Sequence, residues 1–157
     1  MKAYGPLISL IVIAALAAFA VMHGILGNWF QWMHYFMGFF FCQFAMLKLF
    51  HPEGFAEGFQ MYDLIAMRFR SYGYIYPFIE LLLGLAYLSY VFPLFIYAVT
   101  IIVSLIGAIG VLKALKKGLD LRCACMGTAL DVPLSTVTLT EDIAMGIMAL
   151  FMFIGAI

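Results

Sequence analysis

Long apolar runs alternate along the chain with short stretches rich in polar residues. The apolar runs cover about residues 5–22, 29–50, 74–91, 94–112 and 138–157. A helix needs about 20 apolar residues to cross the hydrocarbon core of a bilayer, with a range of roughly 17–25. The runs fit this range, and none alternates as the strands of a membrane barrel do. The pattern therefore predicts an all-α, integral membrane helical bundle of about five transmembrane helices.

The connection at residues 51–73 has a hydrophobic period of its own. Its large apolar residues recur at helical spacing, while its charged residues lie away from that stripe. The stripe consists of Phe55, Phe59, Tyr62, Ile65 and Phe69. This spacing predicts an amphipathic helix over about residues 54–70. The pattern is equally compatible with a helix that lies in the membrane interface and with a lid that docks under the bundle.

The last apolar run carries a start signal. Thr138 and Glu141 have the spacing of a capping box, which predicts that the fifth transmembrane helix begins at Thr138. Glu141 and Asp142 would then lie in the first turn of that helix, where negative charge is favourable. We therefore favour capping over chemistry for these two carboxylates.

Composition agrees with the apolar pattern and excludes several classes of protein. The chain has 157 residues, of which 67% are hydrophobic and only 10% are charged, against about 25% charged for an average soluble domain. A soluble globule and a disordered chain are therefore excluded. The length fits a single domain over residues 1–157. The formal net charge is zero, so nothing indicates a nucleic-acid partner.

The distribution of basic residues predicts the orientation in the membrane. Five crossings place the N-terminus and the loops at 51–73 and 113–137 on one side, and all eight Lys and Arg residues belong to that side. Positive residues stay on the cytoplasmic side of a membrane. We therefore expect a multi-pass protein of a bacterial inner (cell) membrane, with the N-terminus and both long loops in the cytoplasm.

The most unusual motif is the pair Cys123 and Cys125 in the sequence "DLRCACMGT". In an extended segment, side chains two residues apart share a face, and the nearby basic residues would favour the thiolate. A disulfide prefers Cα atoms roughly 5.5–6 Å apart, which a Cys-x-Cys sequence reaches only with a bent, strained backbone. Strained disulfides are labile and suit exchange. The motif thus fits a catalytic thiol pair.

Two other interpretations of the same motif stay open. Cys123, Cys125 and the neighbouring Met126 could bind a soft ion such as Cu(I) or Hg(II). Zinc is a poorer fit, because it takes four ligands. Alternatively, the two cysteines are simply small apolar residues in a loop that packs onto the bundle.

Glu80 is the clearest ionisable residue inside an apolar run. It lies about two turns into the third run, and ionisable residues within a membrane are costly enough to be functional candidates. The alternative is that Glu80 reaches the interface or pairs with a basic residue of the same side. The candidates for such a pair are Lys48, Arg68 and Arg70.

Two further patterns within the runs indicate packing more than chemistry. His34 and Cys42 share a face of the second run and could hold a metal, but such a face more often packs on a neighbouring helix. Three methionines line one side of the last run, which occurs in copper pathways but more often reflects packing. They are Met145, Met148 and Met152.

Two long stretches of the chain resemble a known family. The stretches "KLFHPEGFAEGFQMYDLIAMRFRSYGYIYPFIELLLGLAYL" and "RCACMGTALDVPLSTVTLTEDIAM" resemble the methylamine-utilisation MauE family, which groups with DoxX-like redox-associated membrane proteins. The resemblance covers about Lys48 to Met145, and "GFAEGFQMYD", "YPFIE" and "CACMGT" are its most specific parts. It implies a small helical membrane protein linked to making the small subunit of methylamine dehydrogenase, through help with disulfide formation. Carried onto this chain, the family pattern points to Cys123, Cys125, Tyr62, Asp63, Pro77, Glu80, Glu141 and Asp142.

The sequence and the resemblance together give three functional hypotheses. The first is a thiol-redox accessory in which Cys123 and Cys125 exchange with a thioredoxin-like or glutaredoxin-like partner, with Glu80 or Asp63 moving protons or holding the cysteine loop. This hypothesis requires no cofactor. The second is soft-metal handling, and the third is a non-catalytic subunit of a larger membrane complex. Disulfide formation belongs to the periplasm, whereas the predicted topology puts the cysteines in the reducing cytosol, so an electron relay would need a partner.

Overall fold

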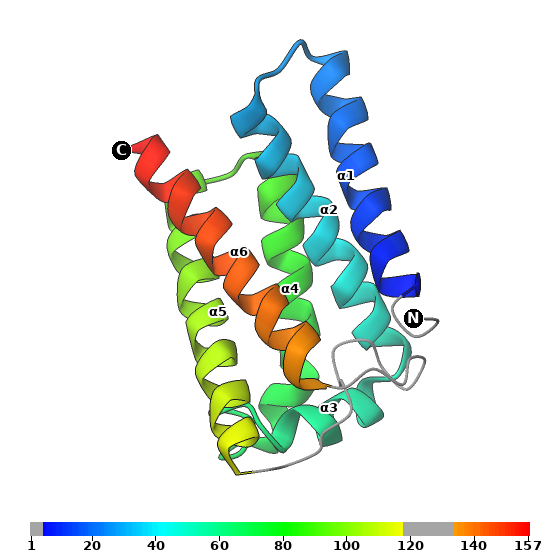
Figure 1. The fold of residues 1–157 in the computed structure, drawn as a ribbon, viewed down its shortest axis with the longest axis vertical. Coiled ribbons are helices and arrows are strands. Elements are labelled where there is room, and N and C mark those ends of the chain that lie inside the picture. The colour runs from blue at the N-terminus through cyan, green and yellow to red at the C-terminus, as the bar shows by residue number, and fades with distance from the viewer. Residues whose placement is uncertain (1–4, 118–133) are drawn as a thin grey trace.

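The computed structural model describes residues 5–117 and 134–157, and within these ranges the chain is helical and contains no strand (Figure 1). This confirms the predicted all-α class. Six helices follow one another in the described residues. They are α1 (Gly5–Gly24), α2 (Trp29–Phe50), α3 (Pro52–Gln60), α4 (Arg70–Ser89), α5 (Pro93–Lys116) and α6 (Leu134–Ala156).

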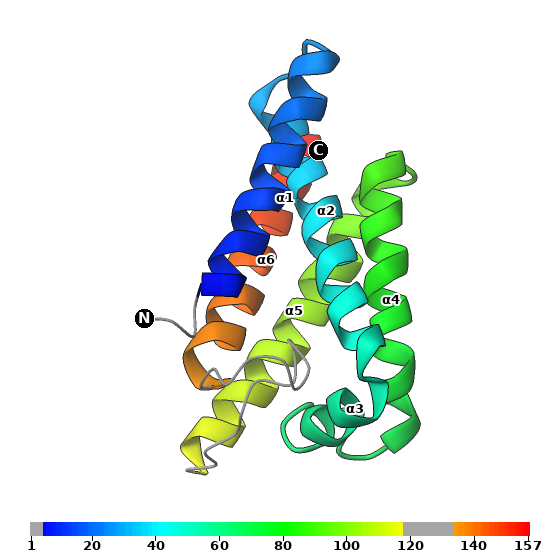
Figure 2. The ribbon, with the colours of Figure 1, turned by 90° about the vertical axis from the view of Figure 1, so that its right-hand side faces the viewer.

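The five long helices form a bundle, and the short α3 closes one of its ends (Figures 1 and 2). The most extensive contacts join α5 to α6 and α2 to α4, while α1 packs on α2 and α3 packs on α4. The opposite end of the bundle holds the turn between α1 and α2, the turn between α4 and α5, and the end of α6. The two ends therefore differ, because among the described residues a helix covers only one of them.

Four of the helices are long and apolar enough to cross a membrane, namely α1, α2, α5 and α6. Large apolar side chains such as Leu16, Phe95 and Phe151 point outward from them, as expected of a surface that faces lipid. The chain is therefore a multi-pass membrane protein. The remaining long helix, α4, has 20 residues but includes Arg70, Glu80 and several tyrosines, and its crossing of the membrane stays a prediction.

Close backbone contact holds α2 and α4 together. A Cβ atom added to Gly84 would lie 2.7 Å from Cys42 Sγ and 2.9 Å from the Cys42 backbone nitrogen, and one added to Gly38 would lie 2.7 Å from the Leu88 side chain. Small residues allow this kind of approach between membrane helices. In the part of the chain that the structure describes, no group of three or more His, Cys, Asp or Glu residues could hold a metal. The contacts of Cys42 are those of a packing residue.

The predicted amphipathic helix over 54–70 is wrong in its length. Helix α3 ends at Gln60, and turns cover the residues up to α4. The reason is Asp63, whose Oδ1 accepts hydrogen bonds from the backbone N–H groups of Ile65 and Ala66, each at 2.9 Å. An Asp side chain that binds its own backbone in this way competes with helix continuation.

The apolar stripe of the predicted helix also divides between two environments. Phe55, Phe59 and Tyr62 are buried in one core cluster with residues of α2 and α5, whereas Phe69 is exposed. Of the two placements that the pattern allowed, α3 therefore takes that of a lid docked under the bundle.

The predicted start of the last helix is also wrong. Helix α6 begins at Leu134, so Thr138 lies inside the helix and is not its N-cap. The sequence from Leu134 to Val137 contains no Gly or Pro, and nothing in it prevents the helix from starting one turn earlier. Glu141 and Asp142 consequently lie beyond the first turn of α6.

Candidate functional site

A buried ion pair lies beneath α3. Lys48, in the last turn of α2, donates a hydrogen bond from Nζ to Oε2 of Glu80, near the middle of α4. The two side chains are only 5% and 4% exposed. Of the three basic residues considered as partners of Glu80, the structure therefore brings Lys48 to it. Two charges so far from water are stable only because each compensates the other.

Aromatic rings surround the ammonium group of this pair. Lys48 Nζ lies 5.9 Å from the ring centroid of Phe44, 5.5 Å from that of Phe55 and 5.2 Å from that of Tyr76. A cation is attracted by the negative face of an aromatic ring within about 6 Å. Since Phe55 belongs to α3, the lid helix supplies one wall of this cage.

A glycine fixes the lid over the ion pair. A Cβ atom added to Gly73, in the first turns of α4, would lie 3.0 Å from the Ala56 Cα atom of α3. Any larger residue at position 73 would therefore push α3 away. Pro77 follows one turn later inside α4 and is buried, and it removes a helical hydrogen bond to the carbonyl of Gly73.

The ion pair borders a small cavity with polar and apolar walls. Its lining includes Tyr62, which follows α3, and Glu141 and Asp142 from α6. The space open to the centre of a water molecule is about 20 Å³, and roughly 10–15 Å³ is enough to hold one water. The structure thus brings three of the carboxylates that the sequence pointed to, Glu80, Glu141 and Asp142, to one cavity. Proton exchange between carboxylates and a water is the chemistry that such a cavity can support.

Asp63 lies next to this cavity without lining it. Its carboxylate is buried and holds the turn after α3 through Ile65 and Ala66. Burial raises the pKa of Asp63, and the two backbone hydrogen bonds partly offset that effect. The turn packs against α5, because a Cβ atom at Gly110 would lie 2.5 Å from the Tyr62 carbonyl oxygen. Asp63 therefore positions Tyr62 at the cavity.

A second buried polar cluster lies among α2, α4 and α5. His34 is fully buried, and its Nδ1 shares a hydrogen bond of 2.9 Å with the hydroxyl of Tyr97. The Tyr87 hydroxyl donates to Thr100 Oγ1 at 3.1 Å. The His34 ring also packs against the Tyr90 ring, with centroids 3.7 Å apart and an angle of 34° between the ring planes. This cluster contains aromatic and hydroxyl groups, with no carboxylate in these contacts.

Comparison with known families decides which family the chain belongs to. Residues 26–156 match the family described as methylamine utilisation protein MauE. The chain belongs to the MauE family. Searches of the curated proteins and of the solved structures find no match. Membership of the MauE family supports a membrane protein related to methylamine utilisation.

The cysteine motif of this MauE-family chain, Cys123 and Cys125 with Met126, lies outside the described residues. The helices on either side of it are described: α5 ends at Lys116, and α6 begins at Leu134. Glu141 and Asp142, which line the cavity, belong to the helix that directly follows the cysteine segment in the sequence.

Sequence reasoning missed most of the surroundings of Glu80 in this MauE-family chain. Lys48 was considered only as one of three partners, and the aromatic cage was not foreseen, because Phe44, Phe55 and Tyr76 come from three helices. The available signal was a lysine placed within an apolar run beside large aromatic residues. Such a lysine must reach the interface or find a partner.

Proposed function

We propose that this MauE-family membrane protein is a thiol-redox accessory, in which Cys123 and Cys125 exchange a disulfide with a thioredoxin-like or glutaredoxin-like partner. Such exchange would serve the maturation of a client protein, as the family resemblance implies for the small subunit of methylamine dehydrogenase. The observation that supports this proposal best is the buried Lys48–Glu80 pair beside a water-sized cavity. Ionisable groups inside a membrane protein mark proton relays and substrate pathways.

The proposed exchange conserves electrons and protons. A thiolate of the reduced partner attacks one sulfur of the Cys123–Cys125 disulfide, which forms a mixed disulfide and releases the other cysteine as a thiolate. The second thiolate of the partner then attacks the mixed disulfide and releases the remaining cysteine. The partner loses two electrons and two protons, and the cysteine pair gains them. The reverse sequence reduces the partner.

Glu80 is the stronger of the two candidates for moving protons in this exchange. It lines the cavity together with Glu141 and Asp142, so a water in the cavity could carry a proton between carboxylates. Lys48 Nζ donates a hydrogen bond to Glu80 Oε2, so its ammonium compensates the charge that remains when a proton leaves Glu80. Asp63 uses its carboxylate to hold the turn after α3, and we assign it a positioning function.

The proposal places the cysteine segment on the cytoplasmic side of a bacterial inner membrane. All Lys and Arg residues belong to that side if the chain crosses five times. A reporter fused to the C-terminus tests this orientation. An enzyme that is active only outside the cytoplasm agrees with five crossings, and one that is active only in the cytoplasm overturns them.

Single cysteine variants test the exchange directly. The full chain is purified in detergent as Cys123→Ser and as Cys125→Ser, each with Cys42→Ser. It is mixed with a thioredoxin whose resolving cysteine is replaced and whose remaining cysteine carries a thionitrobenzoate disulfide, so that thionitrobenzoate leaves as the thiolate of the chain attacks. The mixed disulfide should accumulate in at least one of these variants and disappear on reduction. The matched control is Cys42→Ser alone, which keeps both motif cysteines and should release the partner in oxidised form if that partner retains both of its thiols.

Two results would overturn the proposal. One is the absence of a mixed disulfide with thioredoxin and with glutaredoxin in both single variants. The other is a soft metal that copurifies with Cys42→Ser and is lost when Cys123 and Cys125 are both replaced by Ser, since Cu(I) and Hg(II) select thiolates. The second result would make metal handling the function of the motif.

A further inference from the structure

The turn between α3 and α4 presents large apolar side chains outward from a buried base. Met61, Met67 and Phe69 are 55%, 52% and 64% exposed, whereas Asp63 and Ala66 in the same turn are buried. The hydrogen bond from the Ala66 N–H to Asp63 Oδ1 holds the backbone between them. The exposed side chains therefore project from a turn whose backbone is held in place.

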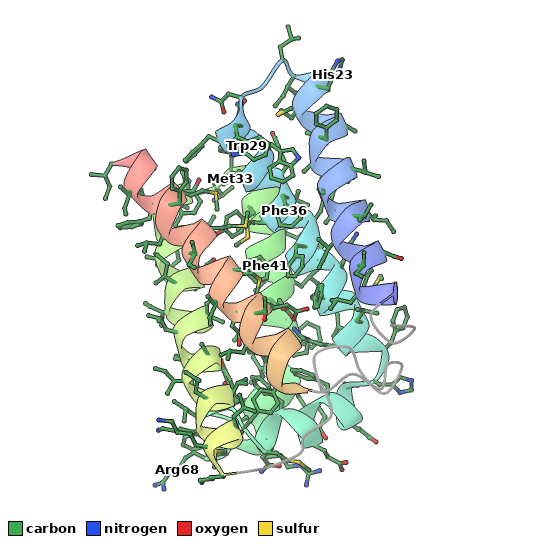
Figure 3. The ribbon with its side chains drawn as sticks, in the orientation of Figure 1. His23, Trp29, Met33, Phe36, Phe41 and Arg68 are labelled. Carbon is green, nitrogen blue, oxygen red and sulfur yellow. The ribbon has the colours of Figure 1, made fainter. Side chains whose placement is uncertain are left out.

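Cationic residues accompany these apolar side chains. Arg68 and Arg70 flank Phe69 directly and are exposed, and Figure 3 shows Arg68 at the end of the bundle that holds α3. The contact of Gly110 with Tyr62 places the last turns of α5 beside this turn. Three exposed lysines of that end of α5 lie nearby but outside the turn: Lys113, Lys116 and Lys117.

Acidic residues only partly compensate this positive surface. Glu57 pairs with Arg70 across 3.6 Å, but both side chains are largely exposed. An exposed pair of this kind is weak and easily exchanged for another partner. Arg68 has no ion pair with any residue that the structure describes. The surface thus combines exposed methionine and phenylalanine side chains with guanidinium groups that can accept an anion.

We propose that the segment from Met61 to Arg70 binds the headgroup of an anionic phospholipid. Met67 and Phe69 enter the boundary between headgroups and acyl chains, and Arg68 and Arg70 bind the phosphate. Guanidinium groups match phosphate geometry through paired N–H donors, and basic clusters next to membrane helices attract anionic lipid. A phospholipid offers apolar acyl chains and an anionic phosphate together, at the depth where the bundle leaves the bilayer. This inference does not depend on the cysteine motif.

Lipid retention by the full chain tests this site. The protein is delipidated in a neutral detergent, mixed with phosphatidylglycerol or with phosphatidylcholine of the same acyl chains, and examined by native mass spectrometry. The wild-type protein should retain several-fold more phosphatidylglycerol than phosphatidylcholine. The double variant Arg68→Gln/Arg70→Gln should lose most of this preference, and Met67→Ser/Phe69→Ser should retain less of both lipids.

A charge-matched control distinguishes a site from general attraction. The variant Lys113→Gln/Lys116→Gln removes the same charge from the same end of the bundle and should keep most of the preference. Equal loss in the two double variants would overturn the proposal, as would equal retention of the two lipids by the wild type. If circular dichroism shows that the arginine variant does not fold, the test uses the wild-type protein alone. Its preference for phosphatidylglycerol over phosphatidylcholine should then fall with added salt.

Discussion

The two buried polar clusters of this protein differ in what they contain and in what surrounds them. Beneath α3, Lys48 and Glu80 form an ion pair at a cavity that two more carboxylates line. Around His34, the polar groups are imidazole and hydroxyl groups that bind one another and pack against aromatic rings. The first cluster has charge and room for a water, and the second fills its space with side chains.

This difference explains why we place the chemistry of the protein at one end of the bundle. Hydrogen-bonded neutral groups can stabilise the packing of membrane helices, and the hydrogen bonds of the His34 cluster fit that purpose, although His34 Nε2 is buried without a hydrogen-bond partner among the described residues. A buried ion pair stabilises a fold poorly compared with apolar residues of similar size. A contribution to stability therefore accounts poorly for the presence of the Lys48–Glu80 pair. The pair lies at the end of the bundle that holds α3 and the start of α6.

The largest effect should come from removing one member of the ion pair. Glu80→Leu or Lys48→Met removes one partner of a buried ion pair, which costs about 3–5 kcal/mol of stability. The double variant Lys48→Met/Glu80→Leu should recover most of that loss. Unfolding by denaturant in mixed micelles, followed by circular dichroism, measures the free energies. Losses that simply add in the double variant would show that the two residues do not act as a pair.

Displacing the turn beside the cavity should have the next largest effect. A methyl group in Gly110→Ala would meet the Tyr62 carbonyl oxygen at 2.5 Å, and overpacking of this kind costs about 1–3 kcal/mol. Gly146→Ala in α6 is the matched control, because its nearest neighbour would be Ser104 Cβ at 3.4 Å. That variant should be neutral or gain up to about 1 kcal/mol from better helix propensity. A similar response of both variants in the same unfolding measurement would contradict the tight contact.

The neutral cluster should respond less than the charged one. Tyr97→Phe removes the hydrogen bond to the buried Nδ1 atom of His34, and a buried polar atom left without its partner costs about 1–3 kcal/mol. The exposed Tyr74 provides the control, since Tyr74→Phe should change the free energy of unfolding very little. If Tyr97→Phe destabilised the protein as much as Glu80→Leu, the distinction between the two clusters would fail.

The smallest effect is a dependence on pH at Asp63. Because burial raises the pKa of Asp63 above its ordinary 3.8, the folded state holds this proton to higher pH than the unfolded state does. Stability from this group is therefore lost as pH rises from 3.8 through the raised pKa. The free energy of unfolding of the wild type should fall relative to that of Asp63→Asn over this interval. The opposite slope would mean that the backbone hydrogen bonds outweigh burial.

The sequence predicted those parts of the fold that depend on local hydrophobicity. The predicted run at 29–50 has the bounds of α2, and that at 94–112 lies within α5. The start of α6 was predicted too late because a capping motif expresses only a local preference. When the residues before the motif can also be helical, the helix can begin ahead of it. The length of α3 was missed because Asp63 ends the helical pattern through its side chain, and apolar spacing carries no sign of that.

The candidate site was predicted only in part for a similar reason. Glu80 was recognisable because a carboxylate in an apolar run is conspicuous in a sequence. Glu141 and Asp142 were interpreted as charges at a helix start, and only the placement of α6 against α5 and α2 brings them to the cavity of Glu80. The aromatic cage around Lys48 depends on the docking of α3, which is a tertiary contact.

One measurement tests the proposed thiol exchange most directly. The full chain is purified without oxygen or added metal, its thiols are counted by mass-tag labelling, and its metals are determined in the same sample. After exposure to a mild oxidant, we expect a Cys123–Cys125 disulfide that a dithiol readily reduces, with Cys42 as the remaining thiol and no bound metal. About one copper or mercury ion per chain held by the two thiols, or free thiols that resist oxidation, would contradict the proposed exchange.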